Sequence, residues 1–472
     1  MAHGFIPFDL DQRFLLPPDL REWLPESHLA SFILEVVSEL DLGELMQAYA
    51  KNTERGRAGY DPRMLLGLML YGYCTGVRSS RQIERRTYED VAFRVLAGNQ
   101  HPDHDTLADF RQRHLQVVAK LFMQVLRLCQ KADLVKLGHV CIDGTKVKAN
   151  ASKHKAMSYE RMTETEKRLQ AEVTDLLAQA AATDAQEDSQ HGKGKRGDEL
   201  PEELSRRESR LAKIRAAKAA LEQEAKEKAQ QQAVEAKAKN EARERKEQET
   251  GKKLGGHPSF VPSPEQAKPE PKAQRNFTDP DSRIMKDGAS KSFEQCYNAQ
   301  AAVDSTAQVI VAATVTQQAN DKQQLVPMMQ KTIENTGRAP QAASADAGYF
   351  SAAAIGDPSL AGINVLVPPD RQKHSGAAEQ HDPRSERSEP DSAARAMRDK
   401  LREPRNQQLY SRRKVVVEPV FGQTKEARGI RRFLLRGYDK VSAEWGIICL
   451  THNLLKLFRA QGAAPLGAAA RC

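Results

Sequence analysis

The stretch that decides the fold reads Gly138-His139-Val140-Cys141-Ile142-Asp143-Gly144-Thr145-Lys146-Val147-Lys148-Ala149-Asn150. Its apolar run predicts a buried strand, and one carboxylate, Asp143, stands where that run gives way to Gly144. A lone carboxylate is costly to bury unless a cation or hydrogen-bond donors meet it. An Asp-Gly pair after a strand is most often only a turn. A functional interpretation therefore depends on two further carboxylates downstream.

Length and charge narrow the class of protein. The chain has 472 residues, enough for two or three domains with a sizeable core. Its 72 Lys and Arg against 63 Asp and Glu leave a net charge of +9, which suits a polyanionic partner without requiring one. Six widely spaced cysteines form no C-x-x-C pair, so we expect a reducing cytosol and no zinc ribbon. With no signal-peptide pattern and no membrane-spanning apolar run, a cytoplasmic protein without a membrane partner is expected.

Composition divides the chain into six parts. They are a helical N-terminal domain expected to bind DNA (1–135), the first part of an α/β core (136–157), a charged helical or coiled-coil insertion (158–250), a Pro/Gly-rich linker (251–275), the remainder of the core (276–460) and a loose tail (461–472).

Two helices and a tight turn stand out in the N-terminal part. Asp61-Pro62 predicts a helix start and Gly76 a helix end, and Ser79-Ser80-Arg81-Gln82 has the S-x-x-Q form of a capping box. The second helix is basic at Arg85 and Arg86, as in a helix-turn-helix whose second helix enters a major groove. An ordinary helical hairpin explains the same pattern equally well, so both interpretations stay open.

A run of polar residues precedes the next helix. His101-Pro102-Asp103-His104-Asp105 resembles a metal cluster, but nothing in it fixes a ligand geometry. We expect Asp105 to cap a long helix instead. The core-facing stripe of that helix consists of Leu107, Phe110, Val118, Leu121, Val125 and Leu128.

The charged insertion predicts an antiparallel helical hairpin. Two heptad seams, Met162-Leu169-Val173-Leu176 and Leu204-Leu211-Ile214-Leu221, flank a basic turn at 191–197. The second arm, out to about Lys246, lacks leucine or isoleucine in its seam, and we expect it to fray. A solvated coiled coil without chemistry explains this segment, and contact with the DNA backbone or with a second protomer is the alternative.

Beyond a polar loop at 276–286, the sheet pattern resumes. Strands are predicted at 293–304, 308–316, 341–346 and 365–368, with a helix from Asn320-Asp321 to about Glu334 between the second and third of these. Together with the first strand, this order matches a ribonuclease H-like mixed five-stranded sheet. In such a sheet the first and fourth strands are neighbours, which brings Asp143 and Asp346 together.

The third carboxylate lies in a closing helix. Positions 418 and 425 share a helical face, so Glu418 and Lys425 are expected to face the same space two turns apart. Pro419 is tolerated only if the helix begins near it, which would place Glu418 at or beside the N-cap. A simple capping role for Glu418 is therefore the competing interpretation.

Four blocks together resemble bacterial insertion-sequence transposases of the DDE class. They are Val140-Cys141-Ile142-Asp143-Gly144-Thr145, Tyr297-Asn298-Ala299-Gln300, Ser344-Ala345-Asp346-Ala347-Gly348-Tyr349 and Val417-Glu418-Pro419-Val420-Phe421-Gly422-x-x-Lys425. They occur in the order that the family has, and the resemblance extends from the helical N-terminal region to about Leu457.

The resemblance implies a ribonuclease H-like core in which Asp143, Asp346 and Glu418 bind two Mg²⁺ ions, for which Mn²⁺ can substitute. Hard carboxylate oxygens are the ligands that such ions select, and the ions neutralise charge at a reacting phosphate. The family's closing signature adds a Tyr, a basic residue and a Lys. The candidate DNA contacts are Tyr410, Arg413, Lys414 and Lys425, together with Lys146 and Lys148. Arg413 lies one residue too far from the glutamate for the family spacing, and Lys414 would restore it.

The implied activity is hydrolysis of DNA at the ends of a mobile element and transfer of the 3′-hydroxyl to target DNA. The implied partners are the terminal inverted repeats, target DNA and a second or further copy of the chain on DNA. A bacterial cytoplasmic protein, nucleoid-associated when bound to DNA, is expected. Two alternatives stay open: a non-catalytic DNA-binding protein with an oligomerising helical arm, and a nuclease without strand transfer.

Overall fold

The computed structural model describes residues 19–50, 59–191, 202–251, 253, 255–286, 291–370 and 392–461. The predictions for the basic turn at 192–197 and for the tail at 462–472 lie outside these residues. The chain forms two compact units, one of Met1–Val147 with Asn298–Cys472 and one of Lys148–Tyr297. Each unit is described by itself.

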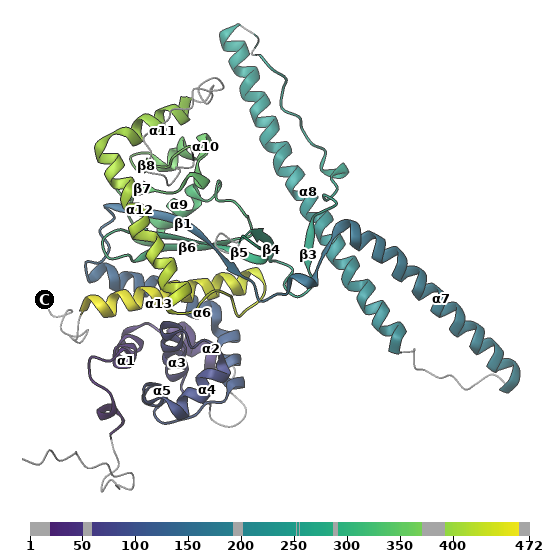
Figure 1. The fold of residues 1–472 in the computed structure, drawn as a ribbon, viewed down its shortest axis with the longest axis horizontal. Helices are drawn as coiled ribbons and strands as arrows, with labels where there is room; N and C mark the ends of the chain where they lie inside the picture. The colour runs from purple at the N-terminus through teal and green to yellow at the C-terminus, as the bar shows by residue number, and fades with distance from the viewer. Residues whose placement is uncertain are drawn as a thin grey trace, which may run out of the picture. The chain divides into compact units, whose positions relative to one another are not determined.

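Short and long helices make up the N-terminal part of the first unit (Figure 1). They are η1 (Leu20–Trp23), α1 (Leu29–Glu39), α2 (Gly43–Ala50), α3 (Pro62–Thr75), α4 (Ser80–Glu89), α5 (Val91–Leu96) and α6 (His104–Lys131). The predicted ends of α3 are confirmed: the Asp61 side chain accepts from the backbone N–H of Arg63, and Gly76 has a left-handed φ of 83°. The interior of α3 is buried, so this helix is the centre of the helical bundle.

Two predicted caps differ from the structure. Asp103, not Asp105, caps α6, because its Oδ1 accepts from the Thr106 N–H at 2.6 Å, three residues on, as an N-cap side chain does. Ser79 precedes α4 but its side chain makes no cap hydrogen bond, so the capping box does not form. His104 Nδ1 lies 2.9 Å from Glu84 Oε2, which gives the supposed metal cluster a structural role.

A mixed sheet forms the centre of the first unit. Its strands are β1 (His139–Lys148), β5 (Phe293–Asp304), β6 (Ile310–Thr316), β7 (Ala342–Ser344) and β8 (Asn364–Leu366), of which β5 begins in the second unit. Their order is β6-β5-β1-β7-β8, and β4 (Arg283–Lys286), which also pairs with β5, makes the sheet six-stranded rather than five-stranded as expected. Strands β5 and β6 are antiparallel, whereas β1, β7 and β8 are parallel. The expected mixed sheet is therefore present.

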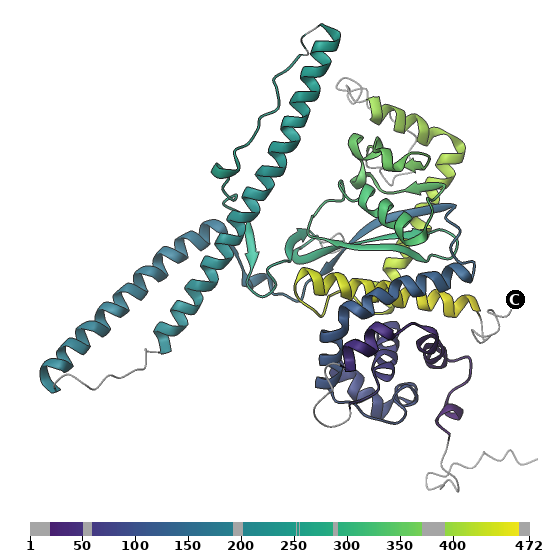
Figure 2. The ribbon, with the colours of Figure 1, turned by 180° about the vertical axis from the view of Figure 1, so that it is seen from behind.

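Helices complete this unit. They are α9 (Leu325–Thr336), α10 (Ala352–Ile355), α11 (Ser392–Arg402), α12 (Pro404–Gly422) and α13 (Tyr438–Gln461), with a π-helical turn at Gln423–Ala427. Helix α9 begins at Leu325 rather than at Asn320, because Gln324 is its N-cap residue. Helix α13 packs against α6, α3 and β6 and buries Trp445 in the core, so it joins the N-terminal helices to the sheet (Figure 2).

The prediction that the closing helix begins near Pro419 is wrong. Helix α12 begins at Pro404, and both Glu418 and Pro419 lie inside it, so Glu418 is not a cap. Proline has no N–H to donate to the carbonyl four residues earlier, which here is the carbonyl of Val415. The side chain of Gln308 donates to that carbonyl at 2.9 Å. A hydrogen bond from a distant residue thus replaces the missing helical one.

The second unit contains two long helices and short strands. They are η2 (Lys153–Lys155), β2 (Ala156–Ser158), α7 (Tyr159–His191), α8 (Glu202–Thr250), η3 (Pro264–Gln266), β3 (Gln274–Asn276) and β4 (Arg283–Lys286). Strands β2 and β3 are antiparallel, and β4 pairs with the first residues of β5. The loop predicted at 276–286 is therefore partly strand.

Helices α7 and α8 pair in opposite directions. Glu172 contacts Arg207, Glu166 contacts Arg215, and Tyr159 donates to Glu222, so the two helices are antiparallel. The pairing buries five residues of the seams predicted from the heptads, together with Ala217: Met162, Leu169, Leu211, Ile214 and Leu221.

The expectation that the second arm frays is wrong, because α8 continues to Thr250. Its outer part has a seam of alanines instead of leucines: Ala229, Ala233 and Ala236 are buried. The chain after α8 returns along this helix, as Figures 1 and 2 show, and Asn240 and Ser259 exchange two hydrogen bonds. Small side chains allow that close return.

Gly76 provides a test of how the helical part joins the rest of its unit. An added Cβ would lie 2.5 Å from the carbonyl oxygen of Arg428, and φ is left-handed. We expect Gly76→Ala to lower the free energy of unfolding by about 3 kcal/mol or more, from backbone strain plus steric overlap. Gly98→Ala is the matched control, because Gly98 also has a left-handed φ but nothing lies within 4 Å of its added Cβ.

Thermal or urea unfolding of the full chain measures both variants. Gly98→Ala should cost only about 1–2 kcal/mol, the backbone part alone. Equal losses of unfolding free energy in the two variants would show that the close approach of Gly76 to Arg428 does not contribute to stability.

Candidate functional site

Parallel pairing places two of the predicted carboxylates together. His139 pairs with Ala342 and Cys141 pairs with Ser344, so Asp143 and Asp346 each lie two residues beyond the same paired position. Asp346 follows the end of β7, but β1 continues past Asp143 to Lys148, so the strand end predicted at Asp143 is wrong. The parallel register still places the two carboxylates at the same level of the sheet. Asp346 then turns the chain, because its Oδ1 accepts from the Gly348 N–H at 2.9 Å.

A side-chain hydrogen bond fixes this register. His139 Nε2 lies 2.9 Å from Ser344 Oγ, across the β1–β7 pair, and both residues are buried. Burial, with a further contribution from the positive charge of Arg412, lowers the pKa of His139 to about 4. The ring is therefore neutral near pH 7, which suits a buried hydrogen bond to a hydroxyl group.

Asp143 is held by one backbone donor and one cation. Its Oδ1 accepts from the Gly144 N–H at 2.8 Å, and its Oδ2 accepts from Arg413 Nη1 at 3.1 Å. Burial raises the pKa of Asp143 to about 7 although Arg413 opposes the shift, and the negative charges of Asp346 and Asp321 raise it further. The carboxylates are thus close enough to repel one another.

The third carboxylate in this group, Asp321, was not a predicted site residue. Its Oδ1 accepts from Asn298 Nδ2 and from Gln300 Nε2, each at 2.7 Å. Tyr349 donates in turn to Gln300 Oε1, and Lys146 Nζ lies 3.9 Å from Asp321 Oδ1. Its sequence context indicated only a helix start. The available signal was the Asn-Ala-Gln spacing, which places two amides on one face of a strand.

Gly144 permits this network to form. A Cβ at this position would lie 2.3 Å from Gln300 Nε2, 2.9 Å from Asp321 Oδ1 and 3.0 Å from Asn298 Oδ1. Only a residue without a side chain lets β1 pass this close to the amides and the carboxylate. The glycine after Asp143 is therefore a packing requirement, and it forms no turn, because β1 continues to Lys148.

Helix α12 carries the remaining predicted residues past β1. Arg413 is buried and contacts Asp143, and Tyr410 is half-buried and hydrogen-bonded to Arg413. Lys425 Nζ donates to the backbone oxygen of Lys146 at 2.8 Å. Lys414 is exposed. Arg413, rather than Lys414, therefore reaches the carboxylates.

Glu418 lies on α12, between Arg413 on the same helix and Lys425 in the π-helical turn that follows it. It is exposed, and its side chain forms no hydrogen bond or ion pair with the residues that the structure describes. Across those residues, no three His, Cys, Asp or Glu side chains are placed to hold a metal ion. The charges of Asp346 and Asp321 act on Asp143, whereas Glu418 stays exposed on the helix.

In the second unit, Lys148 Nζ lies 3.3 Å from Glu294 Oε1. This predicted DNA contact is therefore neutralised by an acidic neighbour, with its side chain 39% exposed.

The carboxylate group nevertheless suits a hard divalent cation. Neighbouring carboxylates repel one another unless a cation lies between them, and oxygen donors are what Mg²⁺ and Mn²⁺ select. Two polar atoms at the site, Arg413 Nε and Asn298 Oδ1, are buried with no hydrogen-bond partner among the described residues. The donor set and these two polar atoms fit an ionic ligand.

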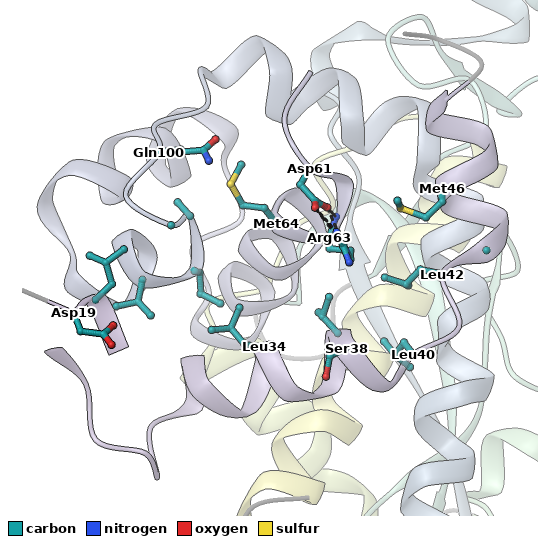
Figure 3. A pocket seen from close by; sticks show the side chains of 17 residues that line it. Asp19, Leu34, Ser38, Leu40, Leu42, Met46, Asp61, Arg63, Met64 and Gln100 are labelled. Atoms are coloured by element: carbon teal, nitrogen blue, oxygen red, sulfur yellow. Dashed lines mark hydrogen bonds and ion pairs between the residues drawn. The ribbon is translucent and has the colours of Figure 1, made fainter. Parts of the chain in front are cut away.

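A separate recess of about 960 Å³ lies in the N-terminal helical part (Figure 3). Apolar side chains such as Leu34, Leu42 and Met46 line it, with the Asp61–Arg63 ion pair at its edge. None of the predicted site residues lines it. It therefore contributes nothing to the carboxylate site.

The chain matches two protein families, both of them transposases. A family model described as Transposase domain (DUF772) matches residues 18–113, and one described as Transposase DDE domain matches residues 259–454. The second match includes Asp346 and Glu418 but begins after Asp143. A search of curated proteins found no match, and neither did a search of solved structures.

These two domains, in this order and with this mixed sheet, define a DNA-transposing enzyme. The two matches together support an insertion-sequence transposase of the DDE class. Enzymes of this class use divalent metal ions to cleave DNA and to transfer the freed strand. Within the described residues, none of the helices is both long and apolar enough to cross a membrane.

Gly144→Ala tests whether the amide network supports the activity. We expect nicking of DNA to fall about 100-fold, because the Cβ would displace Gln300 from Asp321 and shift the neighbouring Asp143. Gly138→Ala is the control, because nothing lies within 4 Å of its added Cβ.

Nicking of a supercoiled plasmid carrying the element ends measures the effect, with far-UV circular dichroism as a check on folding. If Gly144→Ala is folded and nicks DNA as fast as Gly138→Ala, the amide network does not contribute to catalysis.

Proposed function

We propose that Asp143, Asp346 and Glu418 are the metal ligands of this transposase, and that Mg²⁺ is the ion. The observation that carries the proposal is the β1–β7 register, which brings Asp143 and Asp346 to one edge of the sheet. Glu418 belongs to the same site because its helix contacts β1 on both sides of it, through Arg413 to Asp143 and through Lys425 to Lys146.

The strand order supports a ribonuclease H-like core. Two antiparallel strands, β6 and β5, lie on one side of β1, and two parallel strands, β7 and β8, lie on the other. In this arrangement the central strand and its parallel neighbour carry the first two acidic residues. We further propose that the α7–α8 hairpin is an insertion into this core, because it leaves the chain after β1 and returns before β5.

Arg413 has two partners in this proposal. In the structure it neutralises Asp143, and its Nε has no hydrogen-bond partner among the described residues. A guanidinium group binds a phosphate with two parallel hydrogen bonds, a geometry it does not reach with Asp143 here. When DNA enters, Arg413 transfers to a phosphate, Asp143 Oδ2 becomes available as a ligand, and Glu418 turns inward.

The chemistry divides between the bound ion and the chain. Bound Mg²⁺ neutralises charge on the reacting phosphate and lowers the pKa of an attacking water or 3′-hydroxyl. The side chains hold the DNA in line: Arg413 and Lys425 bind phosphates beside the site. Lys146, Tyr410, Lys414 and Lys148 are further candidates for backbone contacts.

Asp321 is a positioning residue in this proposal. Its carboxylate fixes the Asn298 and Gln300 amides and faces Lys146. These groups surround Gly144, the residue next to Asp143. The network therefore limits how far the Asp143 backbone can move when its side chain exchanges Arg413 for a cation.

The substrates proposed are the inverted repeats at the element ends and the target DNA, with a homodimer or higher oligomer as the working form. Helices α3 and α4 are the candidate reading element. Two cations of α4 form i,i+4 ion pairs, Arg85 with Glu89 and Arg86 with Asp90. Because both cations already have an acidic partner, the structure does not test whether α4 reads DNA, and this role stays a prediction.

Asp143→Asn, Asp346→Asn and Glu418→Gln test the ligand assignment. Each should lower Mg²⁺-dependent nicking of the element ends by about a thousandfold or more, because a charged ligand is lost while the shape of the side chain is kept. Binding of the same DNA in EDTA should be retained. Asp399→Asn is the control, since Asp399 is exposed and pairs only with Arg402 in the described structure.

Undiminished nicking in all three variants would contradict the assignment. A strand-transfer assay with pre-cleaved ends separates a transposase from a nuclease that only cuts, because only the transposase joins the 3′-hydroxyl to a second DNA.

A further inference from the structure

The charges on the α7–α8 hairpin are neutralised unevenly. One set of side chains forms a network between the helices: Glu166 contacts Arg215 at 3.1 Å and Lys218 at 2.9 Å, and Glu172 contacts Arg207 at 3.2 Å. Each of these cations has a carboxylate partner. Such pairs keep a solvated coiled coil in register and attract no external anion.

A second set of cations gathers in hollows of the same hairpin. Three adjoining recesses of about 490, 450 and 240 Å³ share Arg210 among their lining residues, and Arg161 and Lys213 each line two of them. We call this surface the basic recess; its cations are Lys155, Arg161, Arg168, Arg206, Arg210 and Lys213, with His154 beside them.

The basic recess is poorly neutralised. Glu164 is the one acidic side chain among the residues that line the three recesses. The side chains of Arg161, Arg210 and Lys213 are exposed and form no hydrogen bond or ion pair with the residues that the structure describes. Like charges held this close repel one another, so an external polyanion gains more free energy here than on a mixed surface.

The spacing of these cations fits a nucleic-acid backbone. Arg206, Arg210 and Lys213 follow one another at four- and three-residue steps on α8, so they form a row with about 5.4 Å between successive turns. Arg161 and Arg168 form a second row on α7, two turns apart. Two rows of cations along a concave surface suit the closely spaced phosphates of duplex DNA.

A protein partner fits this surface less well. Protein interfaces are enriched in aromatic residues and depleted in lysine, with apolar contact at their centre. The apolar side chain of Ile214 lines the recess but is 1% exposed, because it belongs to the hairpin core. Met157 and Phe277 also line the recess, but they are partly buried against the same core, so the exposed side chains of the recess are mainly cations.

We propose that the basic recess of the α7–α8 hairpin binds the phosphate backbone of duplex DNA. The proposal rests on the activity of the chain on DNA and gives the hairpin a role in it, as an electrostatic contact that does not depend on base sequence. The recess orients DNA through Arg161, Arg210 and Lys213, while the carboxylates act on the reacting phosphate.

The test compares two triple variants of the full chain that lose the same charge. Arg161→Ala/Arg210→Ala/Lys213→Ala removes the unpaired cations of the recess. Lys226→Ala/Lys237→Ala/Lys239→Ala removes three exposed lysines from the same helix that line none of the three recesses. Fluorescence anisotropy with a 30-base-pair duplex of arbitrary sequence, in EDTA, measures affinity from 50 to 200 mM salt.

The recess variant should lower the slope of log affinity against log salt by about 2.7, at 0.9 for each lost phosphate contact, and weaken binding at 50 mM salt at least about tenfold. The lysine variant should keep the wild-type slope. Arg161→Lys/Arg210→Lys should also keep it, because the charges remain. Circular dichroism confirms that each variant is helical.

An unchanged slope in the recess variant overturns the proposal, and so does an equal fall in both triple variants, which would indicate diffuse attraction. Loss of self-association without a change of slope would assign the recess to a protein contact and overturn it as well. EDTA prevents cleavage, so this result is independent of the ligand assignment for Asp143, Asp346 and Glu418.

Discussion

The parallel pairing of β1 with β7 is the constraint on which the rest of the site depends. It places Asp143 and Asp346 at the same level of the sheet, each just after a fully buried residue, Ile142 and Ala345. Burial raises the pKa of Asp143, and the negative charge of Asp346 adds to that rise. The surrounding residues supply compensation: a backbone N–H for each carboxylate, and the Arg413 guanidinium for Asp143.

The closing helix, α12, supplies the cation that pairs with Asp143. Arg413 on α12 contacts Asp143, Lys425 in the π-helical turn after α12 contacts the backbone of Lys146, and Glu418 lies between them in sequence. Pro419 interrupts the helical hydrogen bonds within this span, and Gln308 from the β5–β6 connection restores the lost one. An interrupted helix costs less to rotate or shift locally than a fully bonded one. The position of Glu418 next to the proline is consistent with its movement toward the carboxylates.

Several features of the structure were predictable because they depend on local sequence. The position of Asp346 just after β7 follows from an apolar run ending in a carboxylate, whereas Asp143 lies inside β1, which continues to Lys148. The α7–α8 pairing follows from leucine and isoleucine at heptad spacing. The caps at Asp61 and Gly76 follow from simple backbone rules.

The features that escaped prediction depend on partners far away in the sequence. Local rules exclude Pro419 from a helix interior, because proline leaves the Val415 carbonyl without its helical hydrogen bond. The Gln308 side chain donates to that carbonyl instead. Asp321 looked like a helix start because its partners, Asn298 and Gln300, lie on a different element. The outer part of α8 looked unsupported because its seam consists of alanines, which bury well only when another segment passes close to them.

Anomalous diffraction from crystals of the transposase bound to a DNA end and Mn²⁺ would locate the metal ions and their ligands. We expect manganese density in contact with Asp143, Asp346 and Glu418, with Arg413 moved from Asp143 to a phosphate. Manganese bound elsewhere, with Arg413 still paired to Asp143 and Glu418 still facing solvent, would contradict this expectation.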